Sequence, residues 1–344
     1  MRHTVARSLS LAVTGALLSG ALTAPTTLLG QIPDQTGTLV VVNKGAAAAN
    51  LIDLATGTLV ATLPTGDGPH EVAISADGRT AVVTDYGGQT GGNTLTVIDV
   101  PGMSVARTID LGDHRRPHGI AFLPGDSLVV VTSEASGMVV VVRVADGRVV
   151  RAVPTQQGGS HMLALVGEGR RLYTSNIRDG TVSQLDMQAG RYLTRFSVPE
   201  QPEAIGITPD GAEVWVGSNA RGTVSVLDPT TGATEEALHG FGWPYRIFVT
   251  PDNRRVLIPD LRGNTLRVFD RATREQVGEL EFAGAGPQGI TLSADGRIVF
   301  LALSQKDQVA AIDLETLDVV GYLRTGARPD GVAYSRVVLS PSPR

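Results

Sequence analysis

The chain has 344 residues, of which 29 are Lys or Arg and 34 are Asp or Glu, so its formal net charge at pH 7 is -5. This balance gives no general attraction to nucleic acid or to an acidic membrane surface. The chain has no cysteine, which excludes disulfides, thiolate metal ligands and a cysteine nucleophile but leaves the redox compartment open.

The N-terminal segment has the form of a secretory signal peptide. Arg2 and Arg7 precede a short apolar stretch, residues 9–24, that is interrupted by glycine and serine. This stretch is shorter than the run of about 20 strongly apolar residues that spans a bilayer. We therefore expect residues 1–30 to be a signal peptide, cleaved between Ala24 and Ile32, and the mature chain to be periplasmic or secreted without a transmembrane span. A lipoprotein anchor is excluded because no cysteine follows.

One sequence motif recurs along the rest of the chain, and its first copy is Pro69-His-Glu-Val-Ala-Ile-Ser-Ala-Asp-Gly78. The copies start at Pro69, Pro117, Ser160, Pro202, Pro244, Pro287 and Pro329. Successive starts lie 42 to 48 residues apart. A period in the forties, built of short apolar runs separated by turn residues, is typical of propeller blades with four strands each.

The strands of one unit can be read from its fourth copy, where they are expected at 202–208, 212–217, 222–228 and 233–238. Asp-Gly pairs join the first two strands of several units, because Asp bonds to its own backbone and Gly accepts the turn conformation. Six further aspartates end the third strand before a turn: Asp53, Asp99, Asp186, Asp228, Asp270 and Asp313. Repeated carboxylates at equivalent turns are structural rather than catalytic.

The seventh copy stops at Ser335 after one strand, while three strands near the N-terminus have no partner. Those three are expected at 38–43, 50–54 and 58–63. The two ends must then share a blade, which removes the open sheet edges. The predicted fold is an all-β, seven-bladed β-propeller of four-stranded antiparallel blades over residues 38–335, followed by a loose tail, residues 336–344.

Several second strands share a sequence pattern: Arg171-Leu-Tyr-Thr-Ser-Asn176, Val214-Trp-Val-Gly-Ser-Asn219 and Leu39-Val-Val-Val-Asn43. Together with Thr223-Val-Ser-Val-Leu-Asp228, this pattern resembles the YVTN-type β-propeller repeat of the YncE-like family, and the resemblance covers residues 38–335. It implies an extracytoplasmic propeller of binding or unassigned function, and the family has no shared catalytic motif. The Gly-His and Trp-Asp pairs of WD40 blades are missing, which disfavours that related class.

Ligands of propellers usually bind on the face where the loops entering the inner strands surround the central channel. The second residue of each copy is expected at this rim. Around the ring these residues are His70, His118, His161, Glu203, Tyr245, Gln288 and Asp330. We refer to them below as the channel ring.

Three imidazoles from consecutive blades, with Glu203 as a fourth donor, would suit a divalent ion such as zinc or copper. The metal hypothesis therefore names His70, His118, His161 and Glu203 as ligands. The alternative is that these histidines bond to neighbouring loops or to channel water. Tyr245 and the acids Asp330 and Glu71, together with Gln288, would then line a pocket for a polar ligand.

The loops after the second strands place cations in four consecutive blades: Arg178, Arg221, Arg262 and Lys306. A semicircle of cations could hold a carboxylate, a phosphate or a sugar acid, since arginine offers paired donors. The alternative is that they are ordinary exposed turn residues, partly neutralised by nearby aspartates.

No nucleophile, base and orienting acid occur at the spacing of a known catalytic motif. We therefore interpret the chain as an exported, monomeric binding or interaction module for a small polar or anionic ligand or a protein partner. The alternative is a metal-assisted enzyme, lactonase- or lyase-like, that uses the rim histidines on a small polar substrate. A third possibility is a scaffold for another protein, which a large apolar surface patch would indicate.

Overall fold

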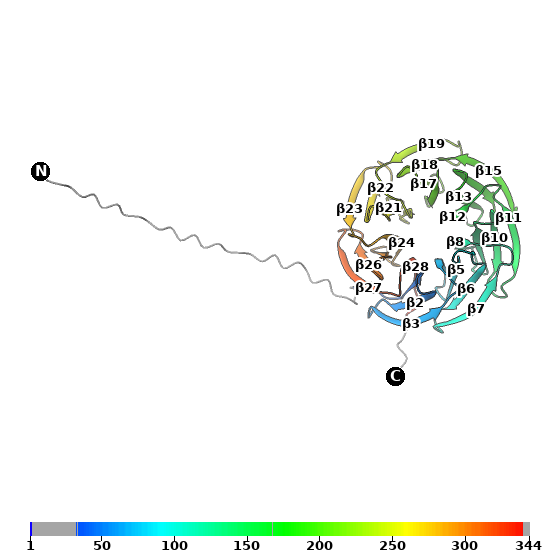
Figure 1. Ribbon diagram of the computed structural model, residues 1–344, viewed down its shortest axis with the longest axis horizontal. Helices are drawn as coiled ribbons and strands as arrows, with labels where there is room; N and C mark the ends of the chain where they lie inside the picture. Colours follow the sequence, from blue (N-terminus) through cyan, green and yellow to red (C-terminus); the bar gives the residue numbers. More distant parts are fainter. Residues whose placement is uncertain (2–31, 33, 167, 340–344) are drawn as a thin grey trace.

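The computed structural model describes residues 1, 32, 34–166 and 168–339. In this part the chain forms strands and turns, and the strands assemble into seven four-stranded antiparallel sheets. None of these residues forms a helix long and apolar enough to span a membrane. Apart from Met1, the expected signal peptide lies outside the described residues. The sheets surround a central channel like the blades of a propeller (Figure 1), which confirms the predicted all-β, seven-bladed fold.

Each blade runs from an inner strand at the channel to an outer strand at the rim of the ring (Figure 1). Blade 1 contains β4 (Pro69–Ile74), β5 (Thr80–Asp85), β6 (Thr94–Asp99) and β7 (Ser104–Asp110). Blade 2 contains β8 (Pro117–Phe122), β9 (Leu128–Ser133), β10 (Met138–Arg143) and β11 (Val149–Pro154). Blade 3 contains β12 (Ser160–Val166), β13 (Arg171–Asn176), β14 (Thr181–Asp186) and β15 (Arg191–Ser197).

The remaining four blades follow the same order. Blade 4 contains β16 (Pro202–Ile207), β17 (Val214–Ser218), β18 (Thr223–Leu227) and β19 (Thr234–Leu238). Blade 5 contains β20 (Phe248–Val249), β21 (Arg255–Asp260), β22 (Thr265–Asp270) and β23 (Gln276–Glu281). Blade 6 contains β24 (Pro287–Leu292), β25 (Ile298–Leu303), β26 (Gln308–Asp313) and β27 (Val319–Arg324). Blade 7 contains β28 (Pro329–Ser335), β1 (Thr38–Asn43), β2 (Ala48–Asp53) and β3 (Thr58–Pro64).

The middle strands of blade 2 are apolar on both faces because the blade packs between two others. In β9, Val129 and Val131 pack in one interblade core and the intervening Val130 packs in the next. Successive side chains of a strand point to opposite faces, so a continuous valine run fills two cores at once. The outer strands, by contrast, are largely exposed on one side, as the pattern of β7 shows.

The acids assigned to turns have that role in the structure. Asp77 Oδ1 accepts hydrogen bonds from Ser75 Oγ at 2.7 Å and from the Arg79 amide at 2.9 Å, while Gly78 has a φ of 80°. Asp228 Oδ1 accepts from the Thr230 amide at 2.7 Å. These carboxylates are therefore used by the hairpins in which they lie.

The ring closes as predicted, by pairing the two ends of the propeller within blade 7. Strand β28 is hydrogen-bonded to β1, with Thr38 opposite Ser335. The expected loose tail differs in part, because Leu339 is buried and packs with Val337 against the core between blades 7 and 1. These apolar side chains cover core residues of the closing blade; residues 340–344 lie outside the described part of the chain.

Blade 5 departs from the repeat at its inner strand. Only Phe248–Val249 is regular, and Pro244 makes an isolated bridge to Asp260. Pro259, in the neighbouring strand, has no N–H to donate to a ladder. The first part of the expected strand is therefore irregular, although it still carries Tyr245 into the channel region.

Candidate functional site

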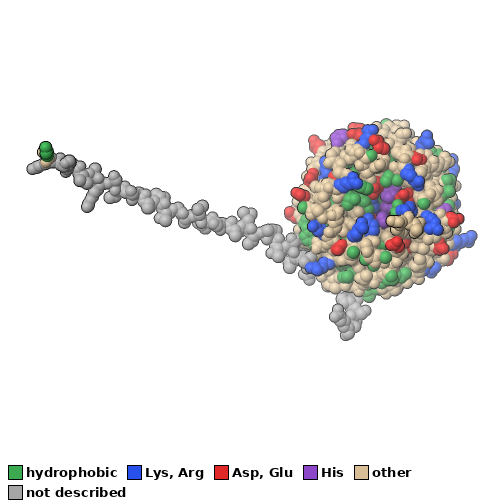
Figure 2. All heavy atoms as spheres, viewed as in Figure 1, with side chains coloured by type: hydrophobic (Ala, Val, Ile, Leu, Met, Phe, Trp, Pro, Cys, Tyr) green, Lys and Arg blue, Asp and Glu red, His purple; other side chains and the backbone are tan. Residues whose placement is uncertain are grey.

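The channel ring converges on one end of the channel. Six of its seven residues are at most 9 % exposed, and His70 is half-buried. This burial places them inside the channel mouth rather than on its solvent-exposed rim. Figure 2 shows histidine side chains near the middle of this face, with Lys and Arg side chains spread around them. We call the face of the propeller on which the channel ring lies the histidine face.

A β-bulge at the start of the inner strands brings further side chains to the channel. The pairing register shifts between Pro69 and Val72 in blade 1, and the same shift recurs at the start of the inner strands of blades 2, 3, 4 and 6. A bulge breaks the strict alternation of side chains. Glu71 in blade 1, which directly follows a ring residue, can therefore reach Arg246 across the channel and form an ion pair with it.

The three histidines of blades 1 to 3 lie against one another. The ring centroids of His70 and His118 are 5.1 Å apart with planes at 60°, and those of His118 and His161 are 3.8 Å apart with planes at 33°. Tyr86 packs beside the first two, with its ring centroid 4.5 Å from that of His70. The Tyr86 hydroxyl donates to Glu134 Oε2 at 2.9 Å, which ties this aromatic cluster to the carboxylates of the site.

His161 lies between two carboxylates. Its Nδ1 is 2.8 Å from Glu134 Oε2, and its Nε2 is 3.7 Å from Glu203 Oε1. Burial alone would favour the neutral imidazole, but contacts with these two carboxylates outweigh it and raise the pKa of His161 to about 9. The same contacts with His161 lower the pKa of Glu134 and of Glu203 against the effect of their burial. At neutral pH His161 is therefore an imidazolium held by two anions.

His70 and His118 are the opposite case. His70 Nδ1 lies 2.7 Å from the Gly68 carbonyl oxygen, to which only a protonated Nδ1 can donate. His118 Nδ1 lies 3.2 Å from Met162 Sδ. Burial lowers the pKa of His70 to about 4 and that of His118 well below its usual range. Both rings are therefore neutral at pH 7, and in His70 the bond to Gly68 leaves Nε2 as the acceptor.

The metal hypothesis is only partly compatible with this arrangement. Two neutral imidazoles with fixed Nδ1 contacts are suitable ligands, but His161 would have to lose its proton before it could bind an ion. The described residues contain no group of three His, Asp or Glu side chains placed to hold a metal ion. The zinc or copper site at His70, His118, His161 and Glu203 stays a prediction.

Arg246 of blade 5 reaches carboxylates of two other blades. It is 6 % exposed, forms an ion pair with Glu71, and places Nη1 4.0 Å from Glu203 Oε1. Its guanidinium carbon lies 4.2 Å from the centroid of the Tyr245 ring. Burial alone would lower its pKa, but the surrounding anions, Glu71 above all, raise it, so Arg246 is charged at every accessible pH.

On the other side of the ring, Asp330 holds two partners. It accepts from the Tyr245 hydroxyl at 3.0 Å and pairs with Lys44 Nζ at 2.8 Å. Burial alone would raise the pKa of Asp330, but Lys44 and the other nearby cations lower it. The ionisable groups of the site thus nearly cancel: Glu71, Glu134, Glu203 and Asp330 oppose Lys44, Arg246 and the His161 imidazolium.

Several buried polar atoms on this face have no hydrogen-bond partner among the described residues, and they include Arg246 Nε, Gln288 Oε1 and Asn219 Oδ1. Buried donors and acceptors without partners are costly, so such atoms generally meet a ligand or an ordered water. Their concentration around the channel ring supports a site for a polar molecule.

A pocket of about 420 Å³ opens beside the ring between blades 5, 6 and 7. It is lined by Leu261, Arg262, Asn264, Gly284, Gln288, Ser304, Gln305 and Arg328. Its only ionisable lining side chains are the two arginines. Arg262 stacks on Trp243, with its guanidinium carbon 4.3 Å from the ring centroid.

The four predicted cations lie on exposed loops of four consecutive blades, and their role as one anion site stays a prediction. All are exposed, and only Arg262 lines this pocket. Arg221 pairs with Glu200 at 3.0 Å, and Arg178 donates to the Glu134 carbonyl at 3.3 Å. Two of the four thus have local partners, as the alternative interpretation expects of exposed turn residues. The Lys306 side chain has no hydrogen bond or ion pair with another residue in the described part of the chain.

Arg246 and Trp243 were not among the predicted site residues, whereas Glu71 was predicted as a rim residue of a polar pocket. Arg246 and Glu71 directly follow ring residues, at a position otherwise occupied by Gly, Ala or Met. Two opposite charges at the same position of the repeat could have indicated an ion pair across the channel. Trp243, whose Nε1 donates to Glu203 Oε2 at 3.1 Å, comes from a loop that no repeat pattern describes.

Comparisons with known proteins establish the fold alone. No protein-family model and no curated protein sequence matches the chain. Hydrazine synthase from Kuenenia stuttgartiensis superposes with a TM-score of 0.71 at 16% identity, covering 88% of this chain and 100% of that one. A functionally unknown protein from Desulfotomaculum acetoxidans superposes with a TM-score of 0.72 at 16% identity, covering 87% and 99%.

Proposed function

We propose that the chain is a binding module whose pocket on the histidine face takes a small anionic ligand, either a carboxylate or a phosphate. The observation that carries this proposal is the composition of the 420 Å³ pocket, in which Arg262 and Arg328 are the only ionisable lining residues. Pockets of this size commonly bind small molecules. Guanidinium groups offer paired donors that match carboxylate and phosphate oxygens.

One residue of the channel ring adds a polar, uncharged group to the wall of this pocket. Gln288 belongs to both, since it is a ring residue and lines the pocket. Its Oε1 has no partner among the described residues, so it can accept a hydrogen bond from a ligand hydroxyl. The ligand we propose therefore carries an anionic group toward the arginines and a hydroxyl toward the ring, as a sugar acid does.

The proposal is tested by titration calorimetry with glucuronate, citrate and inorganic phosphate at low ionic strength, because salt screens exposed charges. We expect at least one of these anions to bind, and the double variant Arg262→Gln/Arg328→Gln to lower its affinity about tenfold or more. The matched control is Arg178→Gln, an exposed arginine of the same face that does not line the pocket. Absence of binding by all three anions, or equal losses in the control, would refute the proposal.

We further propose that this module is an exported protein of the YVTN type. The basic start followed by a short apolar stretch supports export, and the recurring strand pattern supports the YncE-like family. Intact mass of the protein recovered from the periplasm or medium should lack the N-terminal segment, with the new end between Ala24 and Ile32. A soluble protein that retains Met1 would count against export.

A further inference from the structure

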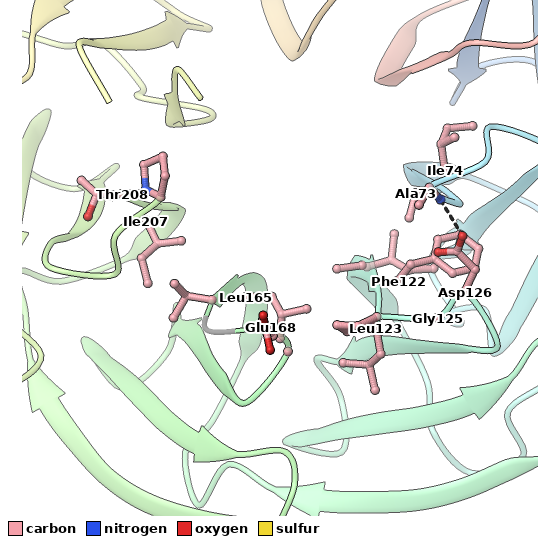
Figure 3. Close-up of a pocket in the computed structure, with 17 residues that line it drawn as sticks. Ala73, Ile74, Phe122, Leu123, Gly125, Asp126, Leu165, Glu168, Ile207 and Thr208 are labelled. Atoms are coloured by element: carbon pink, nitrogen blue, oxygen red, sulfur yellow. Dashed lines mark hydrogen bonds between the residues drawn. The ribbon is translucent and has the colours of Figure 1, made fainter. Parts of the chain in front are cut away.

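The far end of the channel holds a second cavity, of about 750 Å³. It is lined by the last residues of the inner strands of blades 1 to 4 and by the turns that follow them. Figure 3 shows Ile74, Leu165 and Ile207 around one opening. Since the channel ring lies at the first residues of the same strands, this cavity is at the opposite end and is independent of the anion pocket.

The walls of this cavity are aliphatic and aromatic. Ile74, Ile120, Phe122, Leu165 and Ile207 all line it, and all five are only half-buried. Apolar side chains that stay accessible in a concave surface favour an apolar ligand, because burying them against it removes apolar area from water. The volume lies within the range typical of small-molecule sites.

The charges at this cavity have one sign. Asp126 and Glu168 are its only ionisable lining residues, and no basic side chain lines it. Asp126 Oδ2 accepts from the Ala76 amide at 2.8 Å, the dashed bond in Figure 3. Glu168 is exposed and makes no hydrogen bond or ion pair with any other described residue. An apolar chamber with an acidic mouth is complementary to an apolar molecule that carries a positive charge.

We propose that this cavity binds a small cationic amphiphile, an alkyl or aryl group bearing an ammonium. The apolar part would contact the isoleucine, leucine and phenylalanine walls, and the ammonium would lie near Glu168 and Asp126. The anion pocket described above prefers the opposite charge, so the two ends of the channel would select different ligands.

Octyltrimethylammonium, octanoate and octan-1-ol share one tail and differ in charge, which makes them suitable probes for titration calorimetry on the full chain. We expect the cation to bind more tightly than octanoate, with a negative heat-capacity change that reports apolar burial. Glu168→Gln should weaken cation binding about threefold and leave octan-1-ol binding unchanged. Glu315→Gln, an exposed acid of the same face outside the cavity, should leave both unchanged.

Location is tested separately with Ala73→Phe, which places a ring into the cavity at a half-buried lining position. It should reduce binding of both the cation and octan-1-ol at least tenfold. Equal affinity of the cation and octanoate, full binding by Ala73→Phe, or no binding of any probe would overturn the proposal. Should Ala73→Phe fail to fold, the exposed Glu168→Gln variant still decides it. Arg262→Gln/Arg328→Gln should not alter cation binding, which separates this proposal from the anion pocket.

Discussion

At the scale of single residues, the three channel histidines occupy the same strand position and yet differ in charge. His161 contacts two carboxylates, whereas His70 contacts a backbone carbonyl and His118 a thioether. Burial disfavours the charged form of all three imidazoles. In His161 the two neighbouring carboxylates outweigh this effect and favour the charged form. The neighbours of an imidazole, rather than its place in the repeat, therefore set its charge.

This difference predicts a specific pH dependence of stability. The pKa of His161 is raised from 6.5 to about 9, so its stabilising contribution is complete below pH 6.5 and is lost as the pH rises through 9. Urea unfolding of the wild type and of His161→Gln should differ by on the order of 2–3 kcal/mol near pH 6. The two proteins should converge above pH 9. A difference that grows with pH would contradict the charged state of His161.

The predicted zinc or copper site can be tested on the same residues. Because His161 holds a proton at pH 7, metal binding there should release that proton, and affinity should increase from pH 7 to 9. Calorimetry in buffers of different ionisation enthalpy measures the proton release. The His70→Ala/His118→Ala/His161→Ala variant should lose binding; equal binding by this variant and the wild type, or none by either, would leave the histidines without a metal role.

Arg246 is the residue whose loss should harm the channel most. Replacing it with leucine leaves Glu71 buried without its cation and leaves Glu203 with His161 as its remaining cation, which should cost about 3–5 kcal/mol of unfolding free energy. Adding Glu71→Gln should recover part of this loss, since the uncompensated charge is removed. Chemical unfolding of the single and double variants measures both values. The exposed Arg178→Leu, as a control, should change stability by less than about 0.5 kcal/mol.

At the scale of elements, the closing blade joins parts of the chain that are separated by six complete blades. Strand β28 pairs with β1 and its Val332 packs in the core between blades 6 and 7. Without β28 that core is opened and the inner edge of β1 is left unpaired.

Deleting residues 329–344 should therefore lower the melting temperature by roughly 10 °C or more. Deleting residues 340–344 alone is the matched control and should have little effect, because the packed residues Val337 and Leu339 are retained. Differential scanning calorimetry compares the two truncations. Equal melting of the longer truncation and the full chain would show that blade 7 does not depend on β28.

Regular elements were predictable from the sequence because each unit repeats the same turn residues at the same spacing. The first three strands and the closure through β28 were expected within a few residues of their observed bounds. The short inner strand of blade 5 was not expected. The residue that interrupts its pairing, Pro259, belongs to the neighbouring strand β21 and not to the repeated sequence of the inner strand. Ring positions, and Glu134 in a loop after a second strand, could likewise be predicted from the repeat. The partners Arg246 and Trp243 depend on irregular segments that bring different blades together.

At the scale of the whole molecule, one channel connects two chemically different ends. Charged and polar side chains fill the end where the inner strands begin, and apolar side chains surround the end where they finish. Blades 1 to 4 contribute to both ends, through His70, His118, His161 and Glu203 at one and the lining of the apolar cavity at the other. The inner strands thus have two separate roles along their length, which no single motif could have indicated.

The closing pair also determines how the molecule would respond to a mechanical load. Because β28 and β1 are antiparallel with Thr38 opposite Ser335, the flanking chain leaves both strands at the same end of the pair. A force that pulls these flanks apart would load the interstrand hydrogen bonds one after another, as in unzipping, instead of all at once, as in shear. The β28–β1 pair, which stabilises the closed ring against thermal unfolding, is therefore where the ring would open under tension.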